Sequence, residues 1–303
     1  MNTVRLNAYA KLNLTLDIKG TEDGYHTIDS LVTTIDLFDR IVVKKRKDKL
    51  INVTMHGMGS ETIEPEHNNA CLAGEAFVER FGSLGADITV YKNIPIGAGL
   101  GGSSADAAGV LNGMAKLYNI TDGTALKALA DALGSDTGYL LSGGTARMTG
   151  RGEKLSAIAT MSEKWFLLVC PKSGVSTKEC YARFDELKKT GGTRTGRAVE
   201  LLNAGNEEWA AKLFGNDLYE AAASLNPEVR EAYLAVKGFS PLGASMTGSG
   251  SACFAMFETQ ELCSWAKSRY TGRARVYCVK STSAKPKRGW KNPFVLGDEE
   301  KSF

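Results

Sequence analysis

No segment of the 303-residue chain is apolar over a length that could cross a bilayer. The strongest apolar run of the chain, WFLLVC from Trp165, falls far short of the roughly 20 residues that a membrane helix needs. The first residues, MNTVRLNAYAKLNLTLDI, carry Arg5, Lys11 and Asp17 within an alternating pattern. This pattern predicts a strand and not a secretion signal, whose apolar stretch would be uncharged. We therefore expect a cytoplasmic protein that does not associate with membranes.

The six cysteines and three histidines form no recognisable cluster. No Cys-x-x-Cys pair occurs, and the one histidine close to a cysteine, His67 beside Cys71, has no further partner nearby in the sequence. Zinc sites and disulfide frameworks depend on such spacing. The sequence therefore predicts reduced thiols and no dedicated metal site.

The charges nearly balance, with a net charge of +3. This excess is too small to indicate nucleic-acid binding, although it is compatible with an anionic small-molecule substrate. Hydrophobic residues make up 43% of the chain and charged residues 23%, which is typical of a globular protein. We expect a small-molecule partner, and the sequence leaves the oligomeric state open.

The length fits one large domain or two ordinary ones. Strand patterns dominate the first part, where residues 27–46 predict two strands with a turn near 36–39, and ADITVYKN predicts another. Helical periodicity follows around residues 107–117 and again at 124–133, where Gly134 is the expected stop. GGTARMTGRGEKL predicts a hairpin or crossover. We divide the chain into domains at 1–157 and 158–280, with a basic tail at 281–303.

Four glycines and two serines lie between a predicted strand and a predicted helix in IPIGAGLGGSSADAAGVL, residues 94–111. Glycines let backbone N–H groups approach a ligand closely, and a helix N-terminus adds unpaired donors and a partial positive charge. Together they predict a phosphate site. Ser103 or Ser104 is the expected N-cap of the helix, with Asp106 completing a variant capping box.

Several interpretations of this loop remain open. Gly97, Gly99 and Gly102 satisfy the dinucleotide pattern GxGxxG, but Asp122, near the expected acidic position, lies in a turn. A Walker A loop is excluded because no Gly-Lys-Ser/Thr follows the glycines. The stretch also fits a different triphosphate loop, P-x-G-x-G-L-G-x-S-S from Pro95, or a capping turn without a ligand.

IPIGAGLGGSSADAA resembles the ATP-phosphate loop of the GHMP kinases, a superfamily that includes galactokinase, homoserine kinase and mevalonate kinase. The other two motifs of the superfamily have counterparts in the same order, AYAKLNLTLDI before the loop and GASMTGSGSACFAMF after it. The resemblance implies an α+β fold of two domains with the active site in the cleft between them. It also implies ATP with Mg²⁺ as the phosphoryl donor.

DGYHTIDSLVTTIDLFD and LGSDTGYLLSGGTARMTGRGE are similar to one branch of this superfamily. That branch phosphorylates the 2-hydroxyl of a cytidine-diphosphate derivative of methylerythritol in the non-mevalonate route to isoprenoids. The resemblance therefore implies a small-molecule cytidine-diphosphate substrate. Another GHMP-type kinase and a catalytically impaired nucleotide-binding homologue remain alternatives, with a dinucleotide-dependent oxidoreductase further behind.

Two residues carry the implied chemistry. Asp136 follows the helix stop in GSDTG, where it can face a cleft as the catalytic acid/base or cap the next turn. Lys11 lies in an otherwise apolar strand, where it can polarise the substrate hydroxyl and lower the pKa of the aspartate, or be an exposed strand lysine. The resemblance favours the catalytic role for both.

The resemblance also implies binding residues. Asn13 shares a strand face with Lys11 and belongs to the substrate site. Tyr25 and His26 recognise the cytosine, Tyr181 closes its other side, and Thr177 lies in the same pocket. The remaining implied contacts are Gly248, Ser249 and Gly250 in the late loop, Asn69 and Lys92 at adenine, and Pro95, Gly97, Gly99, Leu100, Gly101, Gly102, Ser103 and Ser104 at phosphate.

Three departures from the family pattern concern the geometry of the site. Asp136-Thr137-Gly138-Tyr139 lacks the usual proline, which should loosen the turn that directs the base. Ser103 replaces a third consecutive glycine, which changes which serine meets phosphate or Mg²⁺. Lys178 replaces a proline in the segment that carries Tyr181.

Overall fold

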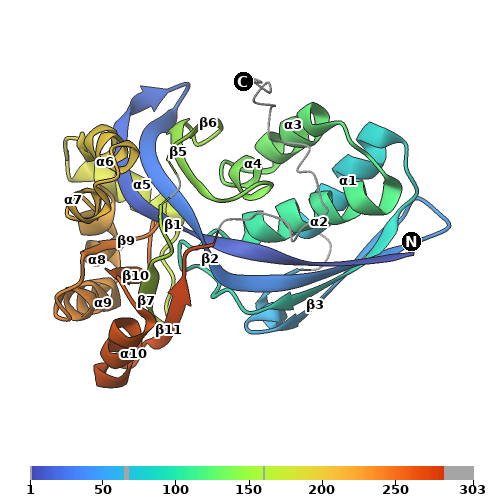
Figure 1. Ribbon diagram of the computed structural model, residues 1–303. Coiled ribbons are helices and arrows are strands. Elements are labelled where there is room, and N and C mark those ends of the chain that lie inside the picture. Colours follow the sequence, from blue (N-terminus) through green and yellow to red (C-terminus); the bar gives the residue numbers. More distant parts are fainter. Residues whose placement is uncertain (1, 65–67, 160, 283–303) are drawn as a thin grey trace, which may run out of the picture.

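The computed structural model describes residues 2–64, 68–159 and 161–282. Within them, the chain forms two β-sheets with helices packed around them, which is a mixed α+β fold (Figure 1). The larger sheet has seven strands in the order β3-β4-β2-β1-β8, with β5 paired to β2 and β6 paired to β5. The smaller sheet has four antiparallel strands in the order β11-β7-β10-β9. Residues 283–303 of the predicted basic tail lie outside the described residues.

The strands are β1 Thr3–Glu22, β2 Tyr25–Lys45, β3 Ile51–Gly57, β4 Ala86–Lys92, β5 Thr145–Gly150, β6 Lys154–Ala157, β7 Trp165–Cys170, β8 Gly215–Asn216, β9 Gly243–Met246, β10 Cys253–Phe257 and β11 Arg275–Lys280. The helices are the short 3-10 helix Ser60–Thr62, α1 Asn69–Phe81, α2 Gly102–Tyr118, α3 Gly123–Leu133, α4 Thr137–Leu140, α5 Thr177–Glu186, α6 Arg194–Asn203, α7 Glu207–Ala211, α8 Tyr219–Leu225, α9 Pro227–Lys237 and α10 Gln260–Arg269.

Strand β2 is continuous, so the predicted turn near residues 36–39 is wrong. Tyr9 of β1 pairs with Phe38, but Lys11, two residues later, pairs with Thr34. Three residues of β2 therefore oppose one residue of β1 in a bulge, which bends a strand without reversing it. One of these extra residues, Ile35, is fully buried. The segment that resembles a turn in the sequence thus forms a bulge within a continuous strand.

Helix α2 packs across one face of the larger sheet, with α1 and α3 beside it (Figure 1). Its small and apolar side chains are buried over most of its length, in keeping with the predicted periodicity. The predicted strand before the loop, both predicted helices and the hairpin of β5 and β6 are confirmed. Helix α3 ends at Gly134, as expected.

The later part of the chain supplies the whole smaller sheet and also one short strand of the larger sheet. Strand β8 pairs in parallel with β1, through Thr15 with Gly215 and Leu16 with Asn216. Backbone pairing therefore ties the later part of the chain to the larger sheet. The domain division at 157/158 stays a prediction.

The two glycine loops of the sequence touch each other. The first joins β4 to α2, and the second joins β9 to β10. The Thr247 hydroxyl donates to the carbonyl oxygen of Gly99 at 3.2 Å, and the Ala252 amide donates to the carbonyl oxygen of Ala98 at 3.1 Å. Gly99 has a φ of +72°, and a Cβ atom there would lie 2.2 Å from the Thr247 carbonyl oxygen. The contact therefore requires glycine at position 99.

This contact predicts that Gly99→Ala destabilises the protein more than Gly82→Ala does. Gly82 has a φ of +63°, but a Cβ atom there would meet open space. Both variants carry the left-handed penalty of about 1–2 kcal/mol. Gly99→Ala adds about 1–3 kcal/mol of steric overlap. Urea unfolding measures both losses, and equal losses would contradict the close approach of the two loops.

Candidate active site

A cavity of about 730 Å³ lies where the two glycine loops meet β1 and the segment that precedes α4. Most of the predicted site residues line it. Those present are Lys11, Asn13, Asn69, Lys92, Pro95, Gly97, Gly99, Leu100, Gly101, Gly102, Ser103, Ser104, Asp136, Thr177, Tyr181, Gly248 and Ser249. The structure thus assembles motifs from distant parts of the sequence into one pocket. Tyr25, His26 and Gly250 are outside this lining.

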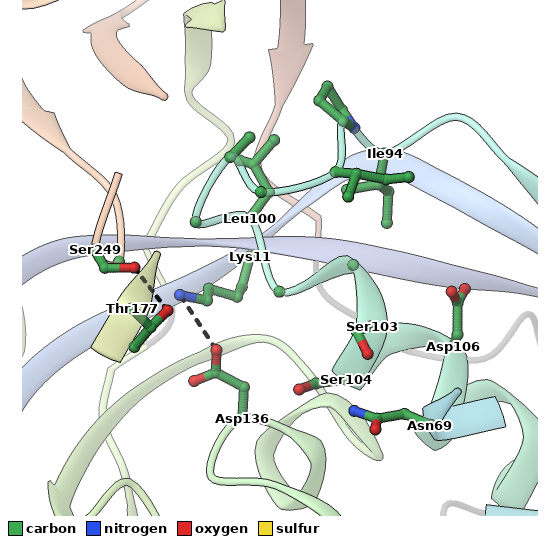
Figure 2. Close-up of a pocket in the computed structure, with 18 of the residues that line it drawn as sticks. Lys11, Asn69, Ile94, Leu100, Ser103, Ser104, Asp106, Asp136, Thr177 and Ser249 are labelled. Atoms are coloured by element: carbon green, nitrogen blue, oxygen red, sulfur yellow. Dashed lines mark hydrogen bonds and ion pairs between the residues drawn. The ribbon is translucent and has the colours of Figure 1, made fainter. Parts of the chain in front are cut away.

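Lys11 and Asp136 face each other across the pocket. The Lys11 Nζ atom lies 3.3 Å from the Asp136 Oδ2 atom, an ion pair that Figure 2 shows as a dashed line. Lys11 is 3% exposed and therefore not a surface lysine, whereas the Asp136 side chain is 27% exposed. Asp136 occupies the N-cap position of α4, but its carboxylate accepts no capping hydrogen bond. Its carboxylate thus remains open to the pocket.

Asn13 connects this ion pair to the late glycine loop. The Lys11 ammonium donates to Asn13 Oδ1 at 2.5 Å, which confirms that both side chains share one face of β1. The same oxygen accepts the backbone N–H of Gly248 at 3.0 Å. The Asn13 amide nitrogen donates to the Ser30 hydroxyl at 2.8 Å. The buried side chains of Lys11 and Asn13 are therefore paired, and Asn13 holds the late loop in place.

The turn that carries Asp136 is fixed without the usual proline. Tyr139 is buried, and its hydroxyl donates to the carbonyl oxygen of Gly144 at 2.5 Å. Burial raises the pKa of this phenol well above its usual value, so it remains a donor. A Cβ atom at Gly138 would lie 2.0 Å from Asp131, whose carboxylate binds Lys127. Tyr139 and this close packing replace the expected restraint on the turn.

The phosphate loop enters α2 through glycine and not through serine. Gly101 is the N-cap in a left-handed conformation, so the predicted serine N-cap is wrong. Because the chain has already turned at Gly101, Ser103 and Ser104 lie inside the first helical turn. The helix start therefore has unpaired N–H groups at the pocket. Figure 2 shows the Ser104 hydroxyl directed toward the side of the pocket that holds Asp136.

A buried charge cluster lies under this loop. The Lys92 ammonium contacts Asp39 Oδ2 and lies 2.6 Å from Asp106 Oδ2, and all three residues are buried. The second oxygen of Asp39 accepts the backbone N–H of Ile94 at 2.9 Å. The cluster thus ties β4, β2 and the first turns of α2 together. Asp106 serves here and not in a capping box, and the contact of Lys92 with adenine stays a prediction.

Tyr181 lines the pocket, and further aromatic side chains lie next to its lining residues. The rings of His26 and Tyr181 have centroids 4.8 Å apart at an interplanar angle of 31°. His26 Nε2 lies 2.8 Å from Asp185 Oδ1, and burial raises the pKa of Tyr181 above its usual range. Tyr25 is 57% exposed at the tip of the hairpin of β1 and β2. Its ring lies under the Arg151 guanidinium, 3.9 Å from ring centroid to Cζ.

Other predicted residues are placed around this core. The hydroxyls of Thr177 and Ser249 lie 2.9 Å apart, which joins α5 to the late loop (Figure 2). Gly250 has a φ of +89° and packs against Met246, so it shapes the late loop from below and does not line the cavity. The sequence did not reveal three features of the site: the role of Asp39, the ion pair between Asp106 and Lys92, and the presence of Arg151 in the pocket lining.

No group of three or more His, Cys, Asp or Glu side chains within the described ranges could hold a metal ion. All six cysteines are free thiols. In the part of the chain that the structure describes, we find no helix that could span a membrane.

Comparison with known proteins identifies the family. The model of the GHMP kinase N-terminal domain matches residues 68–145, and that of the GHMP kinase C-terminal domain matches residues 198–262. A 4-diphosphocytidyl-2-C-methyl-D-erythritol kinase of Clostridium beijerinckii is 36% identical over 259 residues, which cover 84% of this chain and 91% of the relative. A Bacillus thuringiensis enzyme of the same name is 35% identical over 263 residues, covering 84% and 88%.

Solved structures agree with these relatives. A crystal structure of 4-(cytidine 5'-diphospho)-2C-methyl-D-erythritol kinase superposes with a TM-score of 0.76 and 30% identity, covering 92% of this chain and 99% of that one. The fold is shared with homoserine kinase from Cytophaga hutchinsonii, with a TM-score of 0.67 at 17% identity, covering 93% and 95% of the two chains. Fold and pocket are those of an ATP-dependent small-molecule kinase. The chain belongs to the GHMP kinases and, among them, to the family of 4-diphosphocytidyl-2-C-methyl-D-erythritol kinases.

The buried cluster predicts a pH effect on stability. Burial raises the pKa of Asp106 to about 8, with Lys92 opposing this shift and Asp39 reinforcing it. The folded state therefore holds a proton that the unfolded state releases near its ordinary pKa of 3.8. The contribution of this group to the free energy of unfolding falls as the pH rises from about 4 to about 8.

We expect Asp106→Asn to flatten this dependence, because the amide cannot titrate. Urea unfolding between pH 5 and pH 8 measures the slope for wild type and variant. Asp87→Asn, which changes a carboxylate whose side chain is 43% exposed, is the control and should keep the wild-type slope. The same slope in all three proteins would refute a buried proton at Asp106.

Proposed function

We propose that this protein transfers the γ-phosphoryl group of ATP to the 2-hydroxyl of 4-diphosphocytidyl-2-C-methyl-D-erythritol, giving the 2-phosphate and ADP. The reaction belongs to the biosynthesis of isoprenoid precursors, and we place it in the cytoplasm. The observation that carries the proposal is the ion pair of Lys11 and Asp136, 3.3 Å apart, in the same cavity as the phosphate loop. The curated relatives support the choice of substrate.

In this mechanism, Asp136 accepts the proton of the substrate hydroxyl while the oxygen attacks the γ-phosphorus. The O–H bond breaks, an O–P bond forms, and ADP leaves with the electrons of the cleaved P–O bond. The Lys11 ammonium, 3.3 Å from the carboxylate, offsets the negative charge near the reacting oxygen. Asn13 keeps this ammonium in position through its 2.5 Å hydrogen bond.

The phosphate loop binds the triphosphate. The unpaired N–H groups after Gly101 and the dipole of α2 favour negative charge at this end of the helix. Mg²⁺ bound with ATP would neutralise phosphate charge, and its ligands would be phosphate oxygens, water and the hydroxyls of Ser103 or Ser104. Hydroxyl oxygens at a helix start suit an ion that is held mainly by phosphates and water, and the described residues contain no group of three or more His, Cys, Asp or Glu that would hold it alone. Asn69, at the start of α1, is the proposed adenine contact.

The aromatic end of the pocket recognises the cytosine. His26 Nε2 lies 2.8 Å from Asp185 Oδ1, and the tautomer that donates Nε2–H to this carboxylate presents Nδ1 as an acceptor. An acceptor at this position complements the exocyclic amino group of cytosine. Tyr25 and Tyr181 supply rings for stacking, and Thr177 lies beside them. This arrangement favours a cytidine nucleotide over the smaller alcohols that other GHMP kinases phosphorylate.

The first test is ADP release by the purified protein with Mg-ATP, with and without 4-diphosphocytidyl-2-C-methyl-D-erythritol. We expect ADP to depend on this substrate, and mass spectrometry should detect the phosphorylated product. Homoserine and mevalonate serve as control alcohols. Turnover of a control alcohol alone would favour another GHMP-type kinase, and binding of both ligands without turnover would favour a catalytically impaired homologue.

A second prediction concerns the base. Asp136→Asn should lower kcat by about 10²–10⁴-fold, because the amide cannot accept the proton. The KM for ATP should stay within about threefold, since phosphate binding depends on the loop. Asp48→Asn changes an exposed carboxylate that is paired with Arg46, and it should leave kcat unchanged. Wild-type turnover by Asp136→Asn would exclude Asp136 as the base.

A further inference from the structure

Three cationic side chains line the cavity, and two of them are already engaged. The Lys11 ammonium contacts Asp136 and Asn13. The Lys92 ammonium is enclosed between Asp39 and Asp106. Arg151, the third, forms no ion pair with a carboxylate of residues 2–64, 68–159 or 161–282 and is exposed. A substrate that brings a diphosphate of its own, besides the phosphates of ATP, therefore meets one uncommitted cation.

Contacts of the backbone hold the turn that carries Arg151 in place, while the Arg151 side chain is exposed. Arg151 lies at the tip of the turn between β5 and β6, and its backbone N–H donates to Glu153 Oε2 at 2.7 Å. The next residue, Gly152, packs closely on Ser135, because a Cβ atom there would lie 3.0 Å from the Ser135 Cβ atom. Ser135 directly precedes Asp136, so this turn is held at a constant position relative to the proposed base.

The guanidinium of Arg151 covers one face of the Tyr25 ring, with Cζ 3.9 Å from the ring centroid. Arg151 itself lines the cavity, so its guanidinium lies between the cavity lining and the Tyr25 ring that it contacts. Figure 1 shows the turn between β5 and β6 beside the hairpin of β1 and β2. A nucleobase and a guanidinium cannot both stack on that face. A base that stacks there must displace the guanidinium.

We infer that Arg151 exchanges the Tyr25 ring for the diphosphate of the substrate when the base stacks. This inference rests on the proposed function. A guanidinium forms paired hydrogen bonds with phosphate oxygens, which are stronger than its contact with an exposed ring. Arg151 is thus a specificity residue that selects nucleoside diphosphates over the corresponding nucleoside. No covalent step is involved.

The test compares binding of CDP and cytidine by calorimetry, with the ATP site saturated by a non-hydrolysable ATP analogue and Mg²⁺. Arg151→Gln should weaken CDP binding about 10–100-fold, the range for a lost charge-assisted pair. Cytidine binding should not weaken and should strengthen by up to about fivefold, because the nucleoside carries no charge for Arg151 to bind and no longer has to displace the guanidinium from the Tyr25 ring. Arg151→Lys should recover part of the CDP affinity, because it restores charge without the planar fork.

Arg230→Gln, which removes an exposed arginine on α9, is the matched control and should bind both ligands normally. Steady-state kinetics give a second readout, in which Arg151→Gln raises the KM for the diphosphocytidyl substrate and leaves the KM for ATP unchanged. Equal losses for CDP and cytidine, or normal CDP binding by Arg151→Gln, would overturn the role of Arg151 alone. Failure of the wild type to bind CDP would overturn the proposed function and this inference together.

Discussion

The site depends on the pairing of polar groups inside strand β1, which is buried over most of its middle section. A lysine and an asparagine in such a strand would destabilise the fold if they lacked partners. Asn13 satisfies this requirement by binding the Lys11 ammonium, the Ser30 hydroxyl and the Gly248 amide together. The hydrogen bonds that compensate for burying these polar side chains therefore also hold the Lys11 ammonium beside Asp136.

A second buried network sets the position of the phosphate loop. Asp39 lies just beyond the bulge of β2 and binds the loop backbone with one oxygen and Lys92 with the other. The irregular register of β2 thus lies directly beside the carboxylate that supports the loop. The charge cluster and the bulge belong to one arrangement that fixes where α2 begins.

Much of the fold could be predicted from local sequence. The periodicity of α2 and α3, the strand before the phosphate loop and the hairpin of β5 and β6 are local patterns, and these predictions are confirmed. The motif resemblance also gave the family correctly. The wrong predictions, a turn in β2 and a serine N-cap, both arose where tertiary contacts overrode local preference. Neither the register of a bulge nor the left-handed conformation of Gly101 can be recognised from the neighbouring residues in the sequence.

The unforeseen site residues share a physical reason. Lys92 and Asp39 are 53 positions apart in the chain, and only the assembled sheet shows that their charges meet. No sequence motif marks Arg151. It stands out because, among the described lining residues, the other two cations are paired with carboxylates and Arg151 is not. Residues that act through their own chemistry, such as Asp136, are easier to recognise than residues that act through the pairing of their neighbours.

The contact between the two glycine loops also bears on how the protein is made. Gly99 and Thr247 are 148 positions apart, and the Ala98 carbonyl receives its partner from Ala252. Contacts of such high sequence separation form late in folding, because the intervening chain must first be closed into a loop. On the ribosome, the nascent chain cannot close the contact between its two loops until Ala252 has emerged. The pocket is thereby completed only when nearly the whole chain has been synthesised.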